Sequence, residues 1–426
     1  MRRLTVLAFA FFILATYSIV LADNWPQWRG PQGNGVAAAG AYPIKFASDE
    51  NVAWKAAMPG RGSSTPAVWG KRIFVTCGID GQDGLLCFDT NGKELWRKLL
   101  GPEREAKHRN ATGANPSPVT DGKLVVVYFK SGTLACFDFD GNEKWNTNLQ
   151  ERFGKDTLWW DLGTSPVLSG GRVIVAVVQA GESYLAAFEL GDGKLAWRTP
   201  RQYECPPECD QTYSTPQVAK LGGRDVIVTW GADHLTGHDA ATGKLLWECG
   251  GFNPDKATHW RTIASPTVGD GMAIVPYGRG SYLVGVRMEG EGDITEKARL
   301  WAKDGKGQAA DVPSPVVADG KAYVLNDAGQ INCFDLQTGE EQWKAELPKN
   351  RNRYYSSPVL AGDKLYCVRE DGVAFVGQVS DTGFKQLAEN DMGERILATP
   401  VLVDGGLLLR GEDHLFRIAA AGAAEK

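Results

Sequence analysis

The chain has 426 residues, of which 43% are hydrophobic and 23% charged, so it is long enough for two or three ordinary domains. Its net charge of −5 argues against a nucleic-acid-binding protein, because such proteins carry a basic face or stripe. The 51 glycines favour a fold with many tight turns.

The N-terminal residues 1–22 have the pattern of a secretory signal peptide. Two arginines precede an apolar run from Leu4 to Leu21, and the small residue Ala22 ends the segment. The alternative is an uncleaved membrane anchor, because the run is nearly long enough to span a bilayer. We expect cleavage and a periplasmic or secreted protein without a membrane span, in a compartment that permits disulfide bonds.

Two markers then recur in phase along the chain. The first is a Ser or Thr directly before Pro, at Thr65, Ser117, Ser165, Thr215, Ser265, Ser314, Ser357 and Thr399. The second is a stretch such as "CFDTNGKELW" (87–96), which ends in a tryptophan. Seven tryptophans fit this position: Trp54, Trp96, Trp145, Trp197, Trp247, Trp301 and Trp343. The unit that begins at Pro358 has Leu387 there instead.

Between the two markers, short apolar runs alternate with Gly-rich turns, which predicts four strands per unit. Four antiparallel strands in repeats of 42–52 residues are typical of a β-propeller blade. Proline cannot donate to a strand ladder, so it fits the start of the innermost strand, an edge that lines the channel. Tryptophan begins the outermost strand, where its indole can cover the gap between blades. We predict an all-β, eight-bladed propeller.

The two chain ends are expected to close the ring. The last unit, from Thr399, ends after three strands in "HLFRI" (414–418), whereas Trp54 precedes the first marker. The strand "NVAWK" (51–55) is therefore predicted to complete the last blade, which leaves no long free edge. The predicted organisation is a signal peptide at 1–22, an N-terminal extension packed on the propeller at 23–50, the propeller at 51–420 and a disordered tail at 421–426.

With these repeats the chain resembles the quinoprotein-dehydrogenase-like propellers with PQQ-like repeats, particularly the shorter BamB-like proteins. The likeness covers residues 50 to 420 and implies a fold more than a chemistry. BamB-like lipoproteins carry a lipid-modified cysteine at the cleavage site, but "VLADN" (20–24) has none, so no acyl anchor is expected. The quinoprotein alcohol dehydrogenases carry an adjacent cysteine pair that contacts PQQ and long insertions. This chain has no adjacent cysteines and no room for such insertions.

Eight cysteines are present. Cys87, Cys136 and Cys333 occupy the same place in three repeats, and each is expected to be a small buried strand residue. Cys205 and Cys209 in "CPPEC" are predicted to lie in a loop, at a spacing that permits a small disulfide ring. No metal site is predicted there, because no second Cys/His pair at ligand spacing accompanies them.

The loops that enter the innermost strands are the longest, and a propeller places them on one face, which we call the loop-rich face. Aromatic and charged residues concentrate in these loops. The candidate ligand-binding residues are His108, Arg109, Trp159, Trp160, Asp161, His259, Trp260, Arg261, Arg351, Arg353, Tyr354 and Tyr355. The alternative is that the aromatic residues cap the core and the charged ones are simply solvated.

The sequence shows no catalytic constellation, since its five histidines are scattered over different repeats. Our first hypothesis is an exported, non-enzymatic scaffold that binds a protein, peptide or glycan on the loop-rich face, with no cofactor and no metal. The alternative is a PQQ-dependent quinoprotein oxidoreductase, in which PQQ stacks on a tryptophan beside Ca²⁺. A hydrolase on the same face is a third hypothesis.

Overall fold

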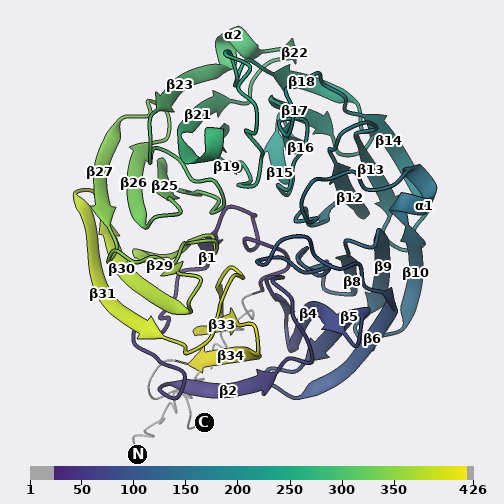
Figure 1. Cartoon of the computed structure of the whole chain (residues 1–426), viewed down its shortest axis with the longest axis vertical. Helices are drawn as coiled ribbons and strands as arrows, with labels where there is room; N and C mark the ends of the chain where they lie inside the picture. The colour runs from purple at the N-terminus through teal and green to yellow at the C-terminus, as the bar shows by residue number, and fades with distance from the viewer. Residues whose placement is uncertain (1–23, 420–426) are drawn as a thin grey trace, which may run out of the picture.

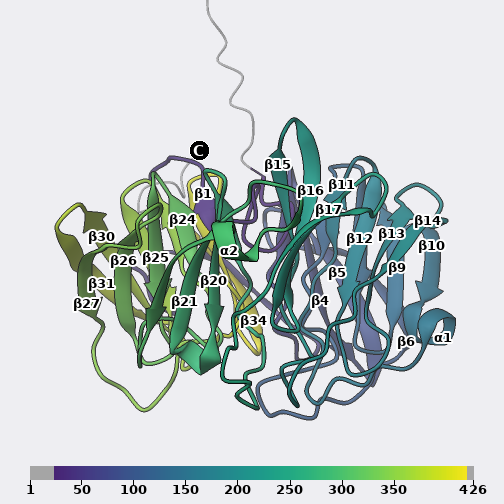
Figure 2. The ribbon, with the colours of Figure 1, turned by 90° about the horizontal axis from the view of Figure 1, so that it is seen from above.

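The computed structural model describes residues 24–419, so the expected signal peptide (1–22) and tail (421–426) lie outside the described residues. Eight twisted sheets surround a central channel (Figure 1). Seen from the side, the sheets stand next to one another in a disc, with loops at both faces (Figure 2). The predicted eight-bladed β-propeller is confirmed.

Blades 1 to 4 follow the chain from the hub, which borders the channel, to the rim. Their strands are β3 (Ala67–Trp69), β4 (Arg72–Ile79), β5 (Gln82–Phe88) and β6 (Glu94–Pro102) in blade 1; β7 (Val119–Thr120), β8 (Leu124–Tyr128), β9 (Thr133–Asp138) and β10 (Glu143–Asn148) in blade 2; β11 (Val167–Ser169), β12 (Arg172–Val177), β13 (Tyr184–Glu189) and β14 (Leu195–Pro200) in blade 3; β15 (Gln217–Leu221), β16 (Arg224–Gly231), β17 (His234–Asp239) and β18 (Leu245–Cys249) in blade 4.

Blades 5 to 8 repeat the arrangement. Their strands are β19 (Thr267–Gly269), β20 (Met272–Tyr277), β21 (Tyr282–Arg287) and β23 (Arg299–Asp304) in blade 5; β24 (Val316–Ala318), β25 (Lys321–Leu325), β26 (Gln330–Asp335) and β27 (Glu341–Glu346) in blade 6; β28 (Val359–Ala361), β29 (Lys364–Val368), β30 (Val373–Ser380) and β31 (Gly383–Asp391) in blade 7; β32 (Val401–Val403), β33 (Gly406–Arg410), β34 (His414–Ala419) and β2 (Val52–Ala57) in blade 8.

Two sheets carry a fifth strand that the sequence did not predict. Strand β1 (Val36–Ala37) pairs in parallel with the hub strand β28, and β22 (Gly292–Asp293) pairs in parallel with the rim strand β18. Helical segments are short: α1 (Leu149–Phe153), the 3₁₀ turn η1 (Gly278–Gly280) and α2 (Thr295–Ala298). Among residues 24–419, none of these helices has the length and apolarity needed to cross a bilayer.

The ring closes as predicted. Strand β2 pairs antiparallel with β34, with Trp54 opposite Arg417 and Lys55 opposite Phe416. Residues from the two ends of the propeller thus share one sheet, at the bottom of Figure 1. Because this pairing covers the last edge, blade 8 gains the fourth strand that its own segment lacks.

The rim tryptophans connect neighbouring blades. Six indole Nε1 atoms donate to backbone carbonyl oxygens of the next blade: Trp54 to Thr90 (2.8 Å), Trp96 to Phe139 (2.9 Å), Trp145 to Leu190 (2.8 Å), Trp197 to Ala240 (3.1 Å), Trp301 to Leu336 (3.1 Å) and Trp343 to Ser380 (2.9 Å). For five of these tryptophans a turn glycine of the next blade lies against the ring: Gly92, Gly141, Gly193, Gly243 and Gly339. At Gly193, which has a φ of +69°, a Cβ would come within 2.6 Å of the Trp145 ring.

The core lies between the blades rather than at one centre. Val126 and Cys136 of blade 2, for example, pack in one cluster with Val175 and Phe188 of blade 3. Cys87, Cys136 and Cys333 are fully buried free thiols, as expected from their repeated position. The apolar contacts that stabilise one sheet therefore depend on its neighbours.

The Ser/Thr-Pro markers form a ring of hydrogen bonds around the hub. The backbone N–H of one marker donates to the hydroxyl of the next at 2.8–3.1 Å. These pairs are Thr65 to Ser117, Ser117 to Ser165, Ser165 to Thr215, Thr215 to Ser265, Ser265 to Ser314, Ser314 to Ser357 and Thr399 to Thr65. This hydroxyl ring explains why Ser or Thr precedes the prolines: in seven of the eight markers the side chain is the acceptor that joins one blade to the previous one.

Candidate functional site

The loop-rich face holds a cavity of about 740 Å³ at the mouth of the channel. All eight loops that connect one blade to the next contribute to its wall, and the hydroxyl ring lies at its base. We call these connections the interblade loops. A cavity of this size is in the range of small-molecule sites, which measure about 300–1,000 Å³.

The N-terminal segment 24–37 runs through the centre of the ring of blades (Figure 1). Trp25 exchanges two backbone hydrogen bonds with Val68 of the hub strand β3, at 2.9 and 2.7 Å. Trp28 lines the cavity, and its Nε1 donates to Thr399 Oγ1 at 3.2 Å, so it occupies the eighth hydroxyl of the ring. We call this cavity the cup.

Arg29 attaches the segment 24–37 to blade 6 through hydrogen bonds. Its guanidinium is fully buried and donates to the carbonyl oxygens of Ser314 (2.9 Å) and Pro315, on the far side of the channel from β3. Burial lowers the pKa of Arg29 to about 9. Residues 38–50 then pass between blades 7 and 8 to the rim, where Asn390 Nδ2 donates to Ile44 O at 3.0 Å.

The structure divides the twelve predicted site residues into two groups. Those that line the cavity are His108, Trp160, Asp161, Arg261, Arg353 and Tyr355. Those that lie outside it are Arg109, Trp159, His259, Trp260, Arg351 and Tyr354. Trp28, Arg279, Asp311 and Asp327 also line the cavity, although the sequence did not single them out as ligand-binding residues.

Two of the outlying aromatic residues belong to the core instead. Tyr354 is only 1% exposed and packs near Phe375, with ring centroids 6.3 Å apart. Trp260 lies edge-on to Tyr277 at 5.3 Å. Their sequence neighbours Tyr355 and Arg261 do line the cavity, because adjacent side chains in extended backbone point in opposite directions.

Asp161 lines the cavity, but its carboxylate is already engaged. It forms a buried ion pair with Lys130 and accepts the backbone N–H groups of Lys107 (2.9 Å) and His108 (2.9 Å). Lys130 also donates to Glu105 O. Asp161 thus holds the interblade loop that carries His108 and does not offer a free anion to a ligand.

Two exposed tryptophans stand at the rim of the cup. Trp159 is 47% exposed and Trp160 is 37% exposed. Their backbone N–H groups donate to Gln211 Oε1 (2.7 Å) and to the Tyr213 hydroxyl (3.2 Å). His108 lies edge-on to Trp160, with ring centroids 5.6 Å apart. Indoles held in place by such contacts lose little conformational entropy when a partner binds.

Charged groups form a network along the same wall. Arg261 pairs with Asp311 at 3.0 Å and lies 3.7 Å from the Glu208 carboxylate. The backbone N–H of Asp311 donates to Asp327 Oδ2 at 2.7 Å. Burial raises the pKa of Asp311, and it raises the pKa of Asp327 to about 6.

The disulfide that the spacing of Cys205 and Cys209 permits is not formed. Both thiols are free, and Cys209 Sγ donates instead to Ala257 O at 3.2 Å, in the next interblade loop. Burial raises the pKa of both thiols, that of Cys205 to about 12. The loop is closed by a backbone turn, in which Cys209 N–H donates to Pro206 O at 3.0 Å.

The cup does not supply the protein ligands that a divalent cation beside PQQ would need. Within residues 24–419, no three His, Cys, Asp or Glu side chains gather closely enough to hold a metal ion. The carboxylates of Asp161 and Asp311 are paired with Lys130 and Arg261. The chain also lacks the adjacent cysteine pair of quinoprotein alcohol dehydrogenases.

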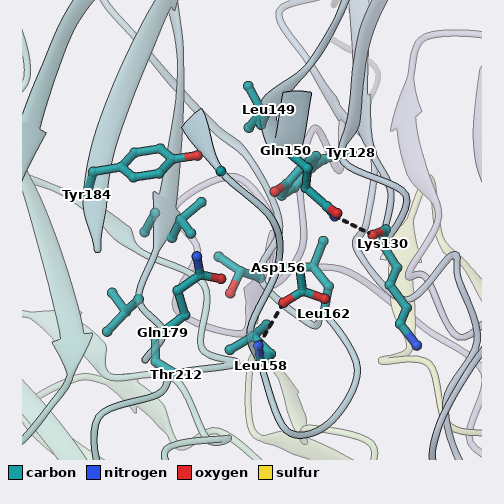
Figure 3. A pocket seen from close by; sticks show the side chains of 15 residues that line it. Tyr128, Lys130, Leu149, Gln150, Asp156, Leu158, Leu162, Gln179, Tyr184 and Thr212 are labelled. Carbon is teal, nitrogen blue, oxygen red and sulfur yellow. Dashed lines mark hydrogen bonds between the residues drawn. The ribbon is translucent and has the colours of Figure 1, made fainter. Parts of the chain in front are cut away.

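A second, much smaller cavity lies between blades 2 and 3 (Figure 3). Tyr128 and Tyr184 border it, and Gln150 Nε2 donates to Lys130 O at 2.8 Å beside it. Its volume of about 20 Å³ suffices for a water molecule and not for a larger ligand. The cup on the loop-rich face remains the better candidate site.

Comparison with known proteins places these features in a family context. The family described as outer membrane protein assembly factor BamB matches residues 82–254 and 291–392, well over half of the chain. BamB of Bordetella pertussis is 26% identical over 380 residues, which cover 87% of this chain and 86% of the relative. BamB of Escherichia coli K12 is 24% identical over 305 residues, which cover 70% and 71%.

Solved structures agree on the fold. BamB from Moraxella catarrhalis superposes with a TM-score of 0.59 at 14% identity, covering 86% of this chain and 98% of its own. A europium-containing methanol dehydrogenase gives a TM-score of 0.70 at 10% identity, covering 92% and 90%. At such low identity these likenesses show the propeller and not its chemistry.

Proposed function

This chain belongs to the outer membrane protein assembly factor BamB family, and on that premise we propose that it is an exported, non-enzymatic scaffold in outer membrane protein assembly. It binds a protein partner through the loop-rich face. The observation that carries the proposal is the exposed pair Trp159 and Trp160, held at the rim of the cup by hydrogen bonds from the backbone.

Protein interfaces concentrate their binding energy in a few such residues. Tryptophan, tyrosine and arginine are enriched among them, and they sit centrally in the contact. The loop-rich face presents Trp159 and Trp160, and Arg261, Arg353 and Tyr355 line the cup on the same face. The opposite face consists mostly of short turns between strands, for example at Gly170, Gly171, Gly222 and Gly223, where an added Cβ would have no other group within 4 Å.

Site-directed photo-cross-linking tests this assignment. We would place p-benzoylphenylalanine at Trp159 and, as a control, at Lys194, an exposed residue in the opposite-face turn before β14. After irradiation in the cell envelope, cross-linked proteins are identified by mass spectrometry. Cross-links to outer membrane assembly proteins from position 159 alone support the proposal. Equal labelling from both positions, or labelling of unrelated proteins only, contradicts it.

The volume of the cup and the fold shared with a methanol dehydrogenase favour a PQQ-dependent oxidoreductase as the second candidate. Titration with PQQ and Ca²⁺, followed by absorption spectroscopy and a dye-linked alcohol assay, separates the two. We expect no bound-quinone band and no alcohol oxidation, because the cation ligands and cysteine pair are missing. A saturable band with turnover would instead establish the oxidoreductase.

The hydrolase hypothesis receives no support from the base of the cup. The ring hydroxyls of Ser117 and Ser165, for example, accept backbone N–H groups of the preceding blades at 2.9 Å. These bonds join blades and show no pairing of a hydroxyl with a general base, which an activated nucleophile requires.

A further inference from the structure

Glu208 lies at the centre of the contacts that arrange the rim of the cup. Its side chain is almost fully buried, and the residue is only 4% exposed. Glu208 Oε1 accepts from Trp160 Nε1 at 2.9 Å and lies 3.7 Å from Arg261 Nη1, and Oε2 lies 3.2 Å from His259 Nδ1. The Glu208 carboxylate thus contacts the Trp160 indole, the His259 imidazole and the Arg261 guanidinium.

These three partners come from different parts of the ring. Trp160 belongs to the interblade loop between blades 2 and 3, Glu208 to the next loop, and His259 and Arg261 to the loop after that. Arg261 continues to Asp311, in the loop between blades 5 and 6. Glu208 therefore joins three consecutive interblade loops, and through Arg261 it reaches a fourth.

The local backbone directs the carboxylate into this position. Glu208 has a φ of +67°, in the left-handed region, and it follows Pro206 and Pro207. His259, with a φ of +64°, donates its backbone N–H to Pro207 O at 3.0 Å. A non-glycine residue at positive φ costs about 1 kcal/mol or more, so the surrounding contacts must hold the turn in place.

A buried carboxylate is stable only when charged or polar donors satisfy it. Here the donors are the groups that border the cup: Trp160 is exposed, Arg261 lines the cavity and His259 lies beside Trp159, with ring centroids 6.2 Å apart. Removing the carboxylate would release the Trp160 indole and leave Arg261 with Asp311 alone.

We propose that Glu208 is the positioning residue of the loop-rich face, which fixes Trp160, His259 and Arg261 in the arrangement that the protein partner contacts. This inference rests on the proposed function. Glu208 itself does not line the cavity, so it acts through the residues that it holds.

The first test reads the position of Trp160 without any partner. Protein labelled with 5-fluorotryptophan gives ¹⁹F resonances for its 14 tryptophans, and Trp160→Phe identifies one of them. We expect Glu208→Ala to shift and broaden that resonance. Glu208→Gln should keep most of the original shift, because its amide oxygen can still accept from the indole. Glu204→Ala, an exposed acid in the same loop, should change nothing.

The second test measures cross-linking from position 159 in the same variants. We expect Glu208→Ala to lower the yield about tenfold, Glu208→Gln to lie between, and Glu204→Ala to match the wild type. The melting temperature of each variant shows whether it is folded. If Glu208→Ala does not fold, the cross-linking yield of Glu208→Gln is compared with that of the wild type.

The outcomes separate the two proposals. An unchanged Trp160 resonance in both Glu208 variants overturns the positioning role, whatever the cross-linking shows. A shifted resonance with an unchanged cross-linking yield overturns it as well, since the arrangement then does not matter to the partner. A shifted resonance in a protein whose wild type yields no cross-links overturns the proposed function instead.

Discussion

Replacing Trp145 with alanine tests whether the rim indoles hold neighbouring blades together. Trp145 begins the outermost part of blade 2 and is 8% exposed. Its Nε1 donates to Leu190 O of blade 3 at 2.8 Å, and Gly193 of the same turn lies against its ring. The substitution therefore removes apolar contacts and a hydrogen bond between two sheets.

The size of the effect follows from the buried surface. A tryptophan buries about 150–250 Å², which at about 25 cal/mol/Å² corresponds to about 4–6 kcal/mol. This is an upper bound, because the unfolded chain already covers part of that surface. Substitutions of buried tryptophan by alanine cost about 3–5 kcal/mol. With an unfolding entropy of about 2.1 cal/mol/K per residue over 426 residues, we expect the Tm to fall by about 5 °C.

Differential scanning calorimetry of the two proteins measures this difference. Arg351→Ala is the control, because Arg351 is exposed and surface substitutions change stability by less than about 0.5 kcal/mol. Its Tm should stay within about 1 °C of the wild type. If the two variants shifted the Tm equally, the indole would not hold the blades together and the account of the repeat would be wrong.

Three further predictions concern the same framework. Gly193→Ala should lower the Tm by several degrees, because its Cβ would come within 2.6 Å of the neighbouring indole at a φ of +69°. Gly191→Ala should leave the Tm unchanged, because no atom lies within 4 Å of the added Cβ. Similar Tm values for the two variants would contradict this prediction. Ser165→Ala should lower the free energy of unfolding by about 1–3 kcal/mol in urea denaturation, because Ser117 N–H loses its acceptor. Ser165→Thr keeps the hydroxyl and should keep most of the stability. An equal loss of unfolding free energy in both variants would contradict the role of the hydroxyl ring. Burial raises the pKa of Asp327 from 3.8 to about 6, so folding favours the protonated carboxyl. This contribution to the free energy of unfolding is fully present below about pH 4. It is lost as the pH rises through about 6, which lowers the stability by about 3 kcal/mol. The Tm of Asp327→Asn relative to wild type should rise over that interval, and parallel Tm curves from pH 4 to 7 would refute the effect.

The fold could be predicted because its determinants repeat. Seven of the eight marker hydroxyls and six of the seven rim tryptophans make the same contact in successive blades, so one interpretation could be checked many times along the chain. The pairing of Trp54 with the last blade followed from counting strands, and the register opposite Arg417 agrees with it. The missing tryptophan at Leu387 has a local substitute: Phe384 lies against Gly377, as Trp301 lies against Gly285.

The site was less predictable because it depends on single, non-repeating contacts. The sequence places Tyr354 and Tyr355 in the same loop but does not say which one turns inward. Asp161 was a candidate ligand-binding residue, and the sequence does not indicate that Lys130, in another hairpin, pairs with it. Glu208 offered no signal apart from the two prolines before it, since its partners lie 48–53 residues away.

The threading of residues 24–37 through the channel has a consequence for biosynthesis. Trp28 and Arg29 are made early, yet their acceptors, Thr399 and Ser314, are made roughly 285 to 371 residues later. Contacts so distant in sequence form slowly, because a long loop must close first. Residues 24–37 must therefore remain unburied until almost the whole polypeptide has been made. A chaperone that shields this segment during that interval would speed folding.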